Sequence, residues 1–600
     1  MILTALVHLY EELCRQGKIA REGWGTAKVS HRILLNQEGK LCGVISARKK
    51  VQKKNKEIEV PYEMRVPLPV TRSSGVKANF LCDNSSYFLG IDDKGNPLRT
   101  KQCFEAARRF HHQVLARCES PSAKAILRYF DTWDLGQAAE NPIIKDQMED
   151  ILAGNQFVFQ VDGVDVIEEE DIKQAWESYQ KGYGEEDGDS ALLGQCLITG
   201  KEHQKIAILH PKIKGVSGAQ MAGASLVSFN APAFCSYGGD GEQGANAPVS
   251  ERAAFAYGSA LNALITDKSH TQLIGDTTLV YWSEHAISAC QDFMGSFLGK
   301  EAVIDDAALD AVAKRIREGL PADLEGMEIS PDEPFYILGL APNAARVSVR
   351  LFLRNTFRSL VTHLAIHQER MKLDGPAWEK GYIPLRKTLK ATANPHGKEQ
   401  VASPLMAGSL LRSILQNTPY PEAVFQNIML RVFADQDKAA EGGKPAVYKI
   451  SHTRAAFIKA YLLKNAKRHW EGQLQMAVNN ECSEISYVLG RMFSILENIQ
   501  KEANPNINTT IKARYFNSAC ATPASVFPIL LKLSNAHLEK LDTGHAIYFK
   551  KKLGTLMDKI VMPLSGSPFP ARLTLEDQGA FVLGYYQEAQ SRYERKEEEK

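Results

Sequence analysis

Residues 335–354 read FYILGLAPNAARVSVRLFLR, and they contain a clear strand pattern. Apolar and other residues alternate in the second half of the stretch, and a period of two is typical of a β-strand with one buried face. The alternating apolar residues are Val347, Val349, Leu351 and Leu353. We therefore expect a strand over residues 346–354 whose apolar face packs inward.

The other face of this expected strand carries charge. A period of two places Arg346, Arg350 and Arg354 together on it. Like charges on one face repel each other unless anions lie nearby, and no acidic residue occurs between Glu333 and Glu369. Either distant carboxylates or a nucleic-acid backbone must supply the anions, and we favour nucleic acid.

The region before this strand mixes strands and helices. Residues 31–46 predict a β-hairpin that turns at Gly39, and a second pair of strands is expected to bracket the lysine run at 48–56. Residues 102–152 have helical spacing. Residues 161–190 form an acidic segment that we expect to be mobile.

After about residue 376 the strand signal fades and helical spacing dominates. One periodic helix carries Ile485, Val488, Leu489, Met492, Leu496 and Ile499. The predicted fold class is α+β, with a mixed α/β N-terminal region followed by an all-α C-terminal helical bundle. The predicted domains are an α+β domain with a basic loop (1–190), an α+β region (191–375) and the helical bundle (376–600).

Composition excludes several classes of protein. The chain has 600 residues, of which 44% are hydrophobic and 24% charged, the balance of a soluble protein with two to four domains. No run approaches the ~18 apolar residues of a membrane span, and the first 16 residues read as an amphipathic helix, not a signal peptide. Ten cysteines without a CxxC pair fit a reducing compartment. We expect a cytoplasmic protein with no cofactor and no metal.

Positive charge is concentrated in two stretches. Residues 40–80 hold ten Lys/Arg against three Asp/Glu, a net +7, and residues 376–475 hold fifteen against seven, a net +8. Residues 161–190 hold two against eleven, a net −9. Such segregation gives basic surfaces that can hold a polyanion, although ordinary solvated surface is the alternative.

The most specific segment lies in residues 196–238, CLITGKEHQKIAILHPKIKGVSGAQMAGASLVSFNAPAFCSYG. Its centre, residues 212–223, is called the GAQ segment below and combines lysines, glycines and a glutamine. Glycines let backbone approach a ligand closely, lysines suit phosphate, and glutamine can hydrogen-bond base edges or wedge between them. The alternative is a Gly/Ala-rich tight turn between strands.

Several blocks resemble one known family. HPKIKGVSGAQ (210–220), SLVSFNAPAF (225–234), SYG and NAPVSE are similar to the signature block of the large subunit of subtype I-C CRISPR complexes. LGLAPNAARVSVR, RYFNSACATPASVFP (514–528) and LEDQGAFVLGYYQ (575–587) resemble further blocks, in the same order. The chain departs from the family at Met221-Ala222, where small polar residues are usual, at Ala513, usually acidic, and after Gln587, where a His-Gln-Arg-like tail is usual.

The resemblance implies a division of labour. A guide RNA held by backbone subunits reads the target by base pairing, while the large subunit reads the short protospacer-adjacent motif in duplex DNA and helps to open the strands. It also implies that the subunit stabilises the displaced strand and presents the open complex to a helicase–nuclease. The implied partners are this ribonucleoprotein, its backbone and small subunits, duplex target DNA and the displaced strand, and no membrane.

Two groups of DNA contacts are expected. The predicted motif-reading residues are Lys212, Lys214, Gly218, Gln220 and Asn230, with Arg72, Lys77 and Asn79 ranked second. The predicted phosphate contacts are Lys49, Lys50, Lys53 and Lys54, the three strand arginines, and Lys464, Lys467 and Arg468 on one helix face. For the lysine run and the helix face, plain solvation is the alternative.

No enzyme motif is apparent. The sequence around Gly194 departs from a phosphate-binding loop, because one residue too many separates its glycines and Glu202 replaces the Ser/Thr. We therefore predict a non-catalytic protein. Since active sites assemble from distant positions, a nuclease of antiviral defence with a dispersed carboxylate metal site is the alternative.

Met476 is predicted to be an internal start. It precedes the periodic helix 484–503, and a product covering 476–600 would hold 125 residues, enough for a small core. Families like the one resembled can make small helical subunits in this way. The alternative is an exposed linker residue.

Overall fold

The computed structural model describes most of the chain. The described residues are 1–19, 21–53, 56–69, 76–93, 95–153, 156–186, 192–229, 231–235, 243–298, 306–324, 326–376, 379, 381–395, 402–440, 446–466, 470–507, 509–560 and 568–598.

The chain forms two compact units. Unit 1 holds Met1, Leu3–Pro211 and Ser228–Ala260, and unit 2 holds Ile2, Lys212–Val227 and Leu261–Lys600. The three-part division at about 190 and 375 stays a prediction.

Unit 1 contains two principal sheets. One has the order β1-β5-β4, and the other β3-β2-β7-β6 with β8 beside β7. Its strands are β1 (Trp24–Val29), β2 (His31–Leu35), β3 (Leu41–Ser46), β4 (Arg48–Lys53), β5 (Lys56–Pro67), β6 (Cys82–Asp83), β7 (Phe157–Val161), β8 (Val164–Asp165), β9 (Leu193–Gly194) and β10 (Gln204–Lys205). Its helices are α1 (Ile2–Arg15), α2 (Ser85–Phe88), α3 (Pro97–Leu115), α4 (Pro121–Thr132), α5 (Pro142–Lys145), α6 (Met148–Ala153) and α7 (Glu170–Glu186).

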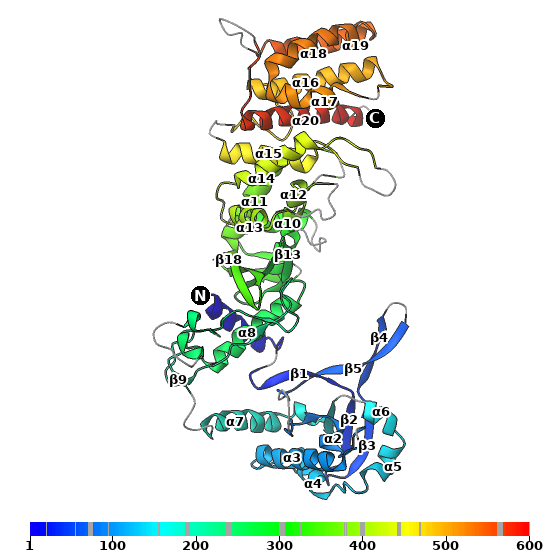
Figure 1. Ribbon diagram of the computed structural model, residues 1–600, viewed down its shortest axis with the longest axis vertical. Helices are drawn as coiled ribbons and strands as arrows, with labels where there is room; N and C mark the ends of the chain where they lie inside the picture. Colours follow the sequence, from blue (N-terminus) through cyan, green and yellow to red (C-terminus); the bar gives the residue numbers. More distant parts are fainter. Residues whose placement is uncertain are drawn as a thin grey trace. The chain divides into compact units, whose positions relative to one another are not determined.

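The predicted hairpin over residues 31–46 is confirmed; the second pair of strands is present, but the lysine run lies within strand β4 and at the start of β5 and not between the strands. Strands β2 and β3 pair antiparallel, and Gly39 in their turn has a φ of +80°. Strands β4 and β5 pair antiparallel and extend as a two-stranded arm beyond helices α2–α6 (Figure 1). Local alternation was enough to locate these strands, because a hairpin closes over few residues.

The expectation of a mobile acidic segment was wrong for residues 170–186. These residues form helix α7, which is held by Trp176. The Trp176 ring stacks on Phe80 at 5.2 Å, and its indole N–H donates to the Gly23 carbonyl at 2.7 Å. Glu170 and Asp171 are exposed at the start of this helix, while Ile172 and Trp176 pack into the core of unit 1.

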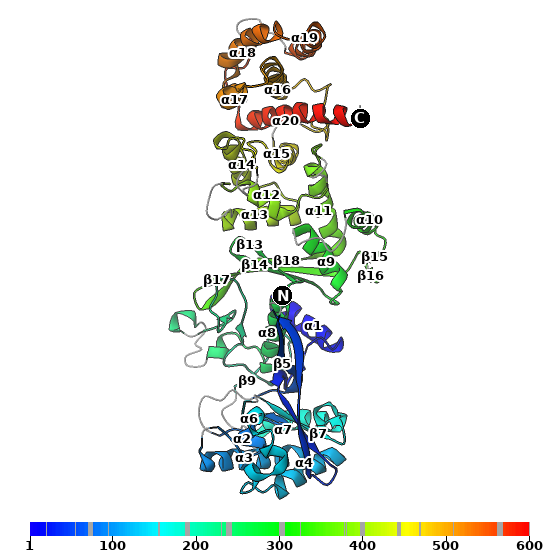
Figure 2. The ribbon, with the colours of Figure 1, turned by 90° about the vertical axis from the view of Figure 1, so that its right-hand side faces the viewer.

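Unit 2 is built on a six-stranded sheet of order β11-β12-β18-β17-β14-β13 (Figure 2). Its strands are β11 (Lys212–Ile213), β12 (Ala224–Ser225), β13 (Thr271–Ile274), β14 (Thr277–Ser283), β17 (Pro334–Asn343) and β18 (Arg346–Thr356), and β15 (Ala322–Leu324) pairs with β16 (Met327–Ile329) outside it. Helix α8 (Glu251–Thr266) begins in unit 1 and ends in unit 2. The predicted strand over 346–354 is confirmed as part of β18.

The rest of the chain is helical. The helices are α9 (Ser288–Leu298), α10 (Asp306–Arg317), α11 (Phe357–Met371), α12 (Leu385–Ala391), α13 (Pro404–Leu415), α14 (Glu422–Ala434), α15 (His452–Asn465), α16 (Ile485–Ala503), α17 (Ile511–Ala521), α18 (Pro523–Leu538), α19 (Thr543–Met557) and α20 (Leu575–Glu598). One hydrophobic core runs from the sheet through these helices. The α+β fold class, with a helical C-terminal part, is confirmed.

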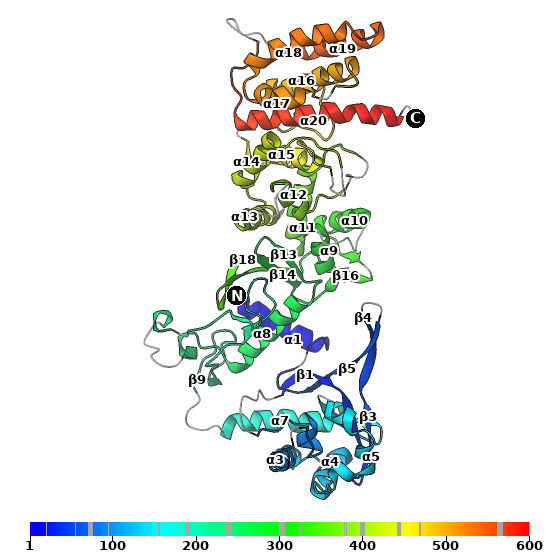
Figure 3. The ribbon, with the colours of Figure 1, turned by 45° about the vertical axis from the view of Figure 1, so that its right-hand side comes forward.

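Helix α20 lies between α16 and α15 (Figure 3). It approaches α16 closely at two glycines. A Cβ atom at Gly490 would lie 2.0 Å from the Phe581 carbonyl oxygen, and one at Gly584 would lie 2.2 Å from the Tyr487 carbonyl oxygen. A larger residue at either position would force these two helices apart.

Candidate nucleic-acid interface

The GAQ segment forms a hairpin at the edge of the unit 2 sheet. Strands β11 and β12 pair antiparallel, and residues 214–223 connect them. The N–H of Ala219 donates to the Val216 carbonyl at 3.1 Å, and the N–H of Gly223 donates to the Gln220 carbonyl at 2.9 Å, so two successive turns shape the loop. Three loop glycines have positive φ, which suits this path. The tight turn between strands, given above as the alternative, is therefore present. Whether the loop can also bind DNA depends on the side chains that it exposes.

The base of this loop is anchored on the sheet side. Val216 is 4% exposed, and the Ser217 N–H donates to Thr278 Oγ1 on β14 at 3.0 Å. The backbone of Lys212 and Lys214 is bonded to the side chain of Asn262 on α8. These contacts anchor the base of the loop and leave its tip in solvent.

The tip displays the predicted residues. Lys214, Gly218 and Gln220 in the loop and Lys212 at its base are exposed, and Met221 is fully exposed at 100%. An exposed amide, two ammonium groups and an apolar side chain on an anchored loop suit contact with base edges and phosphates. Asn230 lies outside the described residues.

The structure brings Arg346 close to the GAQ segment. Ser225 pairs with Lys212 on one side and with Arg346 on the other, so the three residues lie side by side on adjacent strands. The Lys212 ammonium donates to Ser225 Oγ at 3.0 Å. Since neighbouring strands are about 4.8 Å apart, the Lys212 and Arg346 backbones are roughly 10 Å apart.

The prediction that three strand arginines share one face was wrong. Strand β18 has a bulge: Val349 pairs with Leu340 and Leu351 with Gly339, which leaves Arg350 as an extra residue. Beyond the bulge the alternation is inverted. Arg346 pairs with Asn343 and Arg354 with Tyr336, and since these partners are seven residues apart on β17, the two arginines point to opposite faces.

Arg354 is exposed and lies against one aromatic ring. Its guanidinium lies 5.8 Å from the centre of the Tyr336 ring, which stacks on Trp282 at 5.2 Å. The Tyr336 hydroxyl donates to Glu284 at 3.1 Å, and burial and Glu284 raise the pKa of this hydroxyl. Arg346 is half-buried and lies beside Lys212 at the GAQ segment, whereas Arg354 lies on the opposite face with the Tyr336 ring, so the two arginines are not equivalent candidates for DNA contact. Arg350 is exposed, and its carbonyl accepts from Arg412 at 3.0 Å.

The lysine run lies on the arm formed by β4 and β5. Lys49 and Lys50 are exposed; the Lys49 ammonium is 5.5 Å from the Tyr62 ring, and Lys50 pairs with Glu59 across the strands. Lys53 pairs with Lys56 in the backbone register. Lys54 lies outside the described residues. Among its described side chains, the arm therefore exposes Lys49 and Lys50, with Glu59 directly opposite Lys50.

The first residue of the arm is fixed to the body of unit 1. Arg48 donates to Asp150 on α6 at 2.5 Å, and His31 Nε2 lies 2.9 Å from the other oxygen of that carboxylate. The hydrogen bond from His31, followed by that from Arg48, lowers the pKa of Asp150. Asp150 therefore joins the base of the arm to strand β2.

Ser30, His31 and Asp150 contact one another as in a hydrolytic triad. His31 Nδ1 lies 3.0 Å from Ser30 Oγ, but Ser30 is 1% exposed and its hydroxyl donates to the Gln156 carbonyl. A nucleophile must reach its substrate, and this serine cannot without opening the core. The contacts among Ser30, His31 and Asp150 instead support the base of the arm.

The three DNA contacts ranked second, Arg72, Lys77 and Asn79, have different outcomes. Arg72 lies outside the described residues, and Lys77 is exposed. Asn79 is only 5% exposed and its backbone N–H donates to Asp83 at 2.8 Å, so its prediction as a DNA contact was wrong. The polar side chain helps to fill the core of unit 1 instead.

The predicted charged face on α15 is also corrected. The helix ends at Asn465, and Ala466 has an extended backbone, so the helical spacing from Lys464 does not continue. Lys467 and Arg468 lie outside the described residues. The Lys464 ammonium donates to Asn417 at 2.9 Å and lies 4.7 Å from the Tyr420 ring, and burial lowers its pKa to about 8. Lys464 is thus engaged within the protein.

The other cations of α15 are buried. Arg454, 5% exposed, donates to Asp435 at 2.7 Å. Lys459, 4% exposed, donates to the carbonyls of Arg370 and Lys372, and burial lowers its pKa to about 8. These charges hold helices together and are not available to a polyanion.

Met476 lies on the segment before α16. Its side chain is 50% exposed, and its carbonyl accepts from the Asp374 N–H and from Gln587 Nε2, both at 3.1 Å. Gln587 also donates to the carbonyls of Gln475 and Ala477. The segment is therefore docked on α20.

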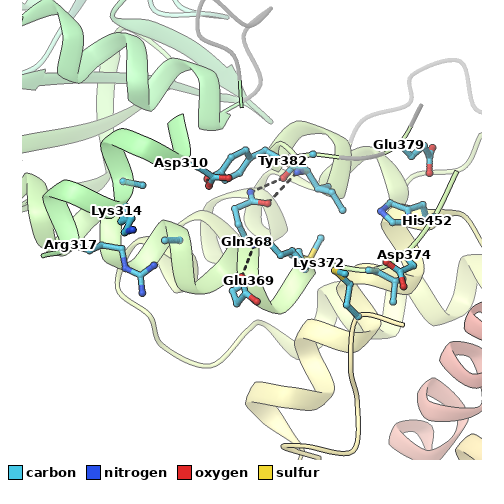
Figure 4. Close-up of a pocket in the computed structure, with 18 residues that line it drawn as sticks. Asp310, Lys314, Arg317, Gln368, Glu369, Lys372, Asp374, Glu379, Tyr382 and His452 are labelled. Atoms are coloured by element: carbon cyan, nitrogen blue, oxygen red, sulfur yellow. Dashed lines mark hydrogen bonds and ion pairs between the residues drawn. The ribbon is translucent and has the colours of Figure 1, made fainter. Parts of the chain in front are cut away.

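A cavity of about 640 Å³ lies beside Met476 within unit 2 (Figure 4). Its lining comes mainly from α10, α11 and the turn after α11. Both cations and carboxylates line it, and Lys372 is already paired with Glu369 at 2.9 Å. Figure 4 shows the Gln368 amide turned to the chain beside Tyr382, where it bonds the Ile383 backbone. Met476, the predicted internal start, lines this cavity, and none of the predicted DNA contacts that the structure describes does.

Sequence reasoning missed the residues that hold the interface in place. Asn262 is a lone polar residue in the apolar run ALNALI, a signal that could have singled it out. Thr278 and Asp150 carry no comparable signal. Within the described residues, no group of three His, Cys, Asp or Glu side chains is placed to hold a metal ion. No described helix is both long enough and apolar enough to cross a membrane.

Comparison with known proteins gives one family. Residues 6–593 match the family model described as CRISPR-associated protein (Cas_Csd1). No curated protein matches the chain. The family resemblance seen in the sequence blocks is confirmed over nearly the whole chain.

Proposed function

The chain belongs to the CRISPR-associated protein family Cas_Csd1, and on this premise we propose that it reads the protospacer-adjacent motif in duplex DNA. It acts as the large subunit of a subtype I-C surveillance complex. The guide RNA selects the target by base pairing, and the protein supplies the contacts to the motif.

The observation that carries this proposal is the anchored GAQ loop. An exposed Gln220 and Lys214 stand on a loop whose base is bonded to β14 and α8. A preorganised loop loses little conformational entropy on binding, so its few polar groups can discriminate between bases. Arg346 beside Lys212 supplies charge for the neighbouring phosphates.

The arm has a different role. Lysines on a two-stranded arm attract any duplex through its phosphates and carry no sequence information. The arm therefore raises affinity for DNA in general and holds the duplex while the loop tests the motif. After recognition the protein promotes strand opening, stabilises the displaced strand and presents the complex to a helicase–nuclease.

The test compares three DNA targets in the assembled complex: a duplex with the motif, a duplex with a scrambled motif, and a target already opened at the motif. Gln220→Ala and Lys214→Ala should weaken binding to the motif duplex by ~1–3 kcal/mol, the scale of one good base or charged contact. Binding to the opened target should suffer less. Lys268→Ala, an exposed lysine elsewhere in unit 2, serves as the control. Equal losses on all three targets would contradict motif reading.

The protein is proposed to be non-catalytic. The alternative, a nuclease with a dispersed carboxylate site, predicts that the purified chain cleaves DNA when a divalent metal is added. Cleavage that disappears with EDTA would favour the alternative.

We also propose that residues 476–600 are made as a separate small subunit. Such a product would keep α16 and α20 together, and Gln587 would still hold the carbonyls of Met476 and Ala477 near its new N-terminus. Expression of the natural coding sequence with a C-terminal tag should give a short second product that is lost when codon 476 is changed. A single full-length band would contradict this.

A further inference from the structure

Asn262 lies one turn before the end of α8, beside the GAQ segment. Its neighbours Leu261 and Leu264 are buried at 0% and 3% exposure. Asn262 Oδ1 accepts from the Lys214 N–H at 2.8 Å, and its Nδ2 donates to the Lys212 carbonyl at 3.1 Å. One side-chain amide thus bonds a backbone carbonyl and the N–H two residues later, as a neighbouring strand would.

These bonds occupy the open edge of β11. The strand has only two residues, and its other edge pairs with β12. Edge groups without a partner are exchanged with water and allow the chain to move. Asn262 therefore substitutes for a missing strand at the point where the loop begins.

The end of α8 also fixes the distance between helix and loop. A Cβ atom at Gly215 would lie 2.8 Å from Ile265 Cγ2. The loop backbone therefore lies directly against the helix. Together with the Ser217–Thr278 bond, this contact pins residues 214–217 and leaves the turn with Gln220 to project from them.

We infer that Asn262 is a positioning residue: it sets how sharply the GAQ segment discriminates the motif from other sequences, without touching DNA. This inference rests on the proposed function. Without its two bonds the loop samples several conformations, and Gln220 and Lys214 must be ordered on each binding event. The loss falls on the base-specific contact more than on long-range phosphate attraction, because only the former needs exact geometry.

The test measures discrimination, the ratio of Kd for the scrambled duplex to Kd for the motif duplex, in the assembled complex. Asn262→Ala should lower this ratio roughly tenfold, the scale of two neutral hydrogen bonds. Asn262→Asp keeps the acceptor for the Lys214 N–H and loses the donor to the Lys212 carbonyl. Its ratio should therefore lie between that of the unchanged protein and that of Asn262→Ala. Lys268→Ala, at an exposed position just after the end of α8, should leave the ratio unchanged. Amide hydrogen exchange of the full-length protein should show faster exchange at Lys214 in Asn262→Ala.

The outcomes separate the possible failures. If Gln220→Ala, measured in parallel, retains discrimination, the proposed function itself is wrong. If Gln220→Ala loses discrimination while Asn262→Ala keeps it, the positioning role is wrong. If Asn262→Ala lowers the melting temperature, Thr278→Val provides the second variant, because it removes only the acceptor for Ser217. Discrimination retained in a folded Thr278→Val protein would also overturn the inference.

Discussion

Two stretches of the chain have nearly equal positive charge and use it in opposite ways. Residues 40–80, net +7 from ten bases and three acids, place Lys49, Lys50 and Lys77 in solvent. Residues 376–475, net +8 from fifteen and seven, bury Arg454 and Lys459 among helices. Net charge along a sequence therefore does not report charge on a surface.

The difference follows from the secondary structure around each stretch. In the helical part, carbonyls at helix ends need donors, and buried cations supply them. Lys459 bonds the last carbonyls of α11, and Arg454 bonds the Ala391 carbonyl at the end of α12. In the arm, β4 and β5 satisfy each other's backbone, so the lysine side chains are not needed for that purpose.

The largest effect is expected where a buried charge loses its partner. Asp435→Ala would leave Arg454 unpaired in the core and should lower the free energy of unfolding by ~3–5 kcal/mol. Glu140→Ala, which breaks an exposed pair with Lys145, should hardly change it. Chemical denaturation measures both. If both variants changed the free energy of unfolding by similarly small amounts, the buried cations of residues 376–475 would not stabilise the fold.

A smaller effect is expected on the arm. Replacing Lys49, Lys50, Lys53 and Lys54 by alanine should weaken binding to every duplex on the order of a hundredfold at low salt. The slope of log affinity against log salt should fall by roughly 0.9 for each phosphate that the arm no longer neutralises. Lys464→Ala should leave that slope unchanged, since Lys464 is bonded to Asn417. Binding titrations at several salt concentrations measure this slope. An unchanged slope in the arm variant would mean that the lysines of the arm are only solvated and do not contact DNA.

The bulge in β18 separates two arginines that look equivalent in the sequence. Arg346→Ala should weaken DNA binding by ~1 kcal/mol, while Arg354→Ala should leave DNA binding intact and cost ~0.5–1 kcal/mol of stability, because the cation no longer packs on the Tyr336 ring. Measuring both quantities for both variants tests the division. Equal effects of the two variants on DNA binding would contradict this division and favour one DNA-binding face that carries both arginines.

The smallest effect concerns pH. The folded-state pKa of Lys459 is about 8 against an ordinary 10.5, so between these values the unfolded chain holds a proton that the folded protein lacks. Unfolding then takes up a proton, and stability rises with pH in this window. From pH 7 to 8 the gain from Lys459 should be a few tenths of a kcal/mol, rising more steeply above pH 8. Lys459→Met should remove this part of the pH dependence; an identical profile would contradict the assignment.

Local patterns predicted much of the fold. The β2–β3 and β4–β5 hairpins, the β18 strand and helix α16 follow from alternation or helical spacing within a few residues. The bulge at Arg350 could not be predicted, because the apolar alternation of β18 is unbroken in the sequence and only pairing with β17 creates it. Helix α7 was missed because its charge hid two anchoring residues, Ile172 and Trp176.

The candidate interface was predicted in part. The GAQ segment stood out by composition, and Gln220 and Lys214 are exposed, as contact with the bases and phosphates of the motif requires. Asn79 was misplaced, since a polar residue beside cations looks the same in a sequence whether it lies in the core or on the surface. The anchoring by Asn262 depends on a contact between segments 48 residues apart, which no local pattern contains.

Site-specific crosslinking tests the central claim most directly, that the GAQ loop touches the motif in duplex DNA. Met221, fully exposed at the tip, is replaced by p-benzoylphenylalanine, and Tyr448, 58% exposed in the C-terminal basic stretch, is replaced in the same way as a comparison. After irradiation of the assembled complex on a motif-bearing duplex, position 221 should crosslink to the base pairs of the motif, and position 448 should not. No crosslink from position 221 to the motif, or equal crosslinking from both positions, would contradict the account.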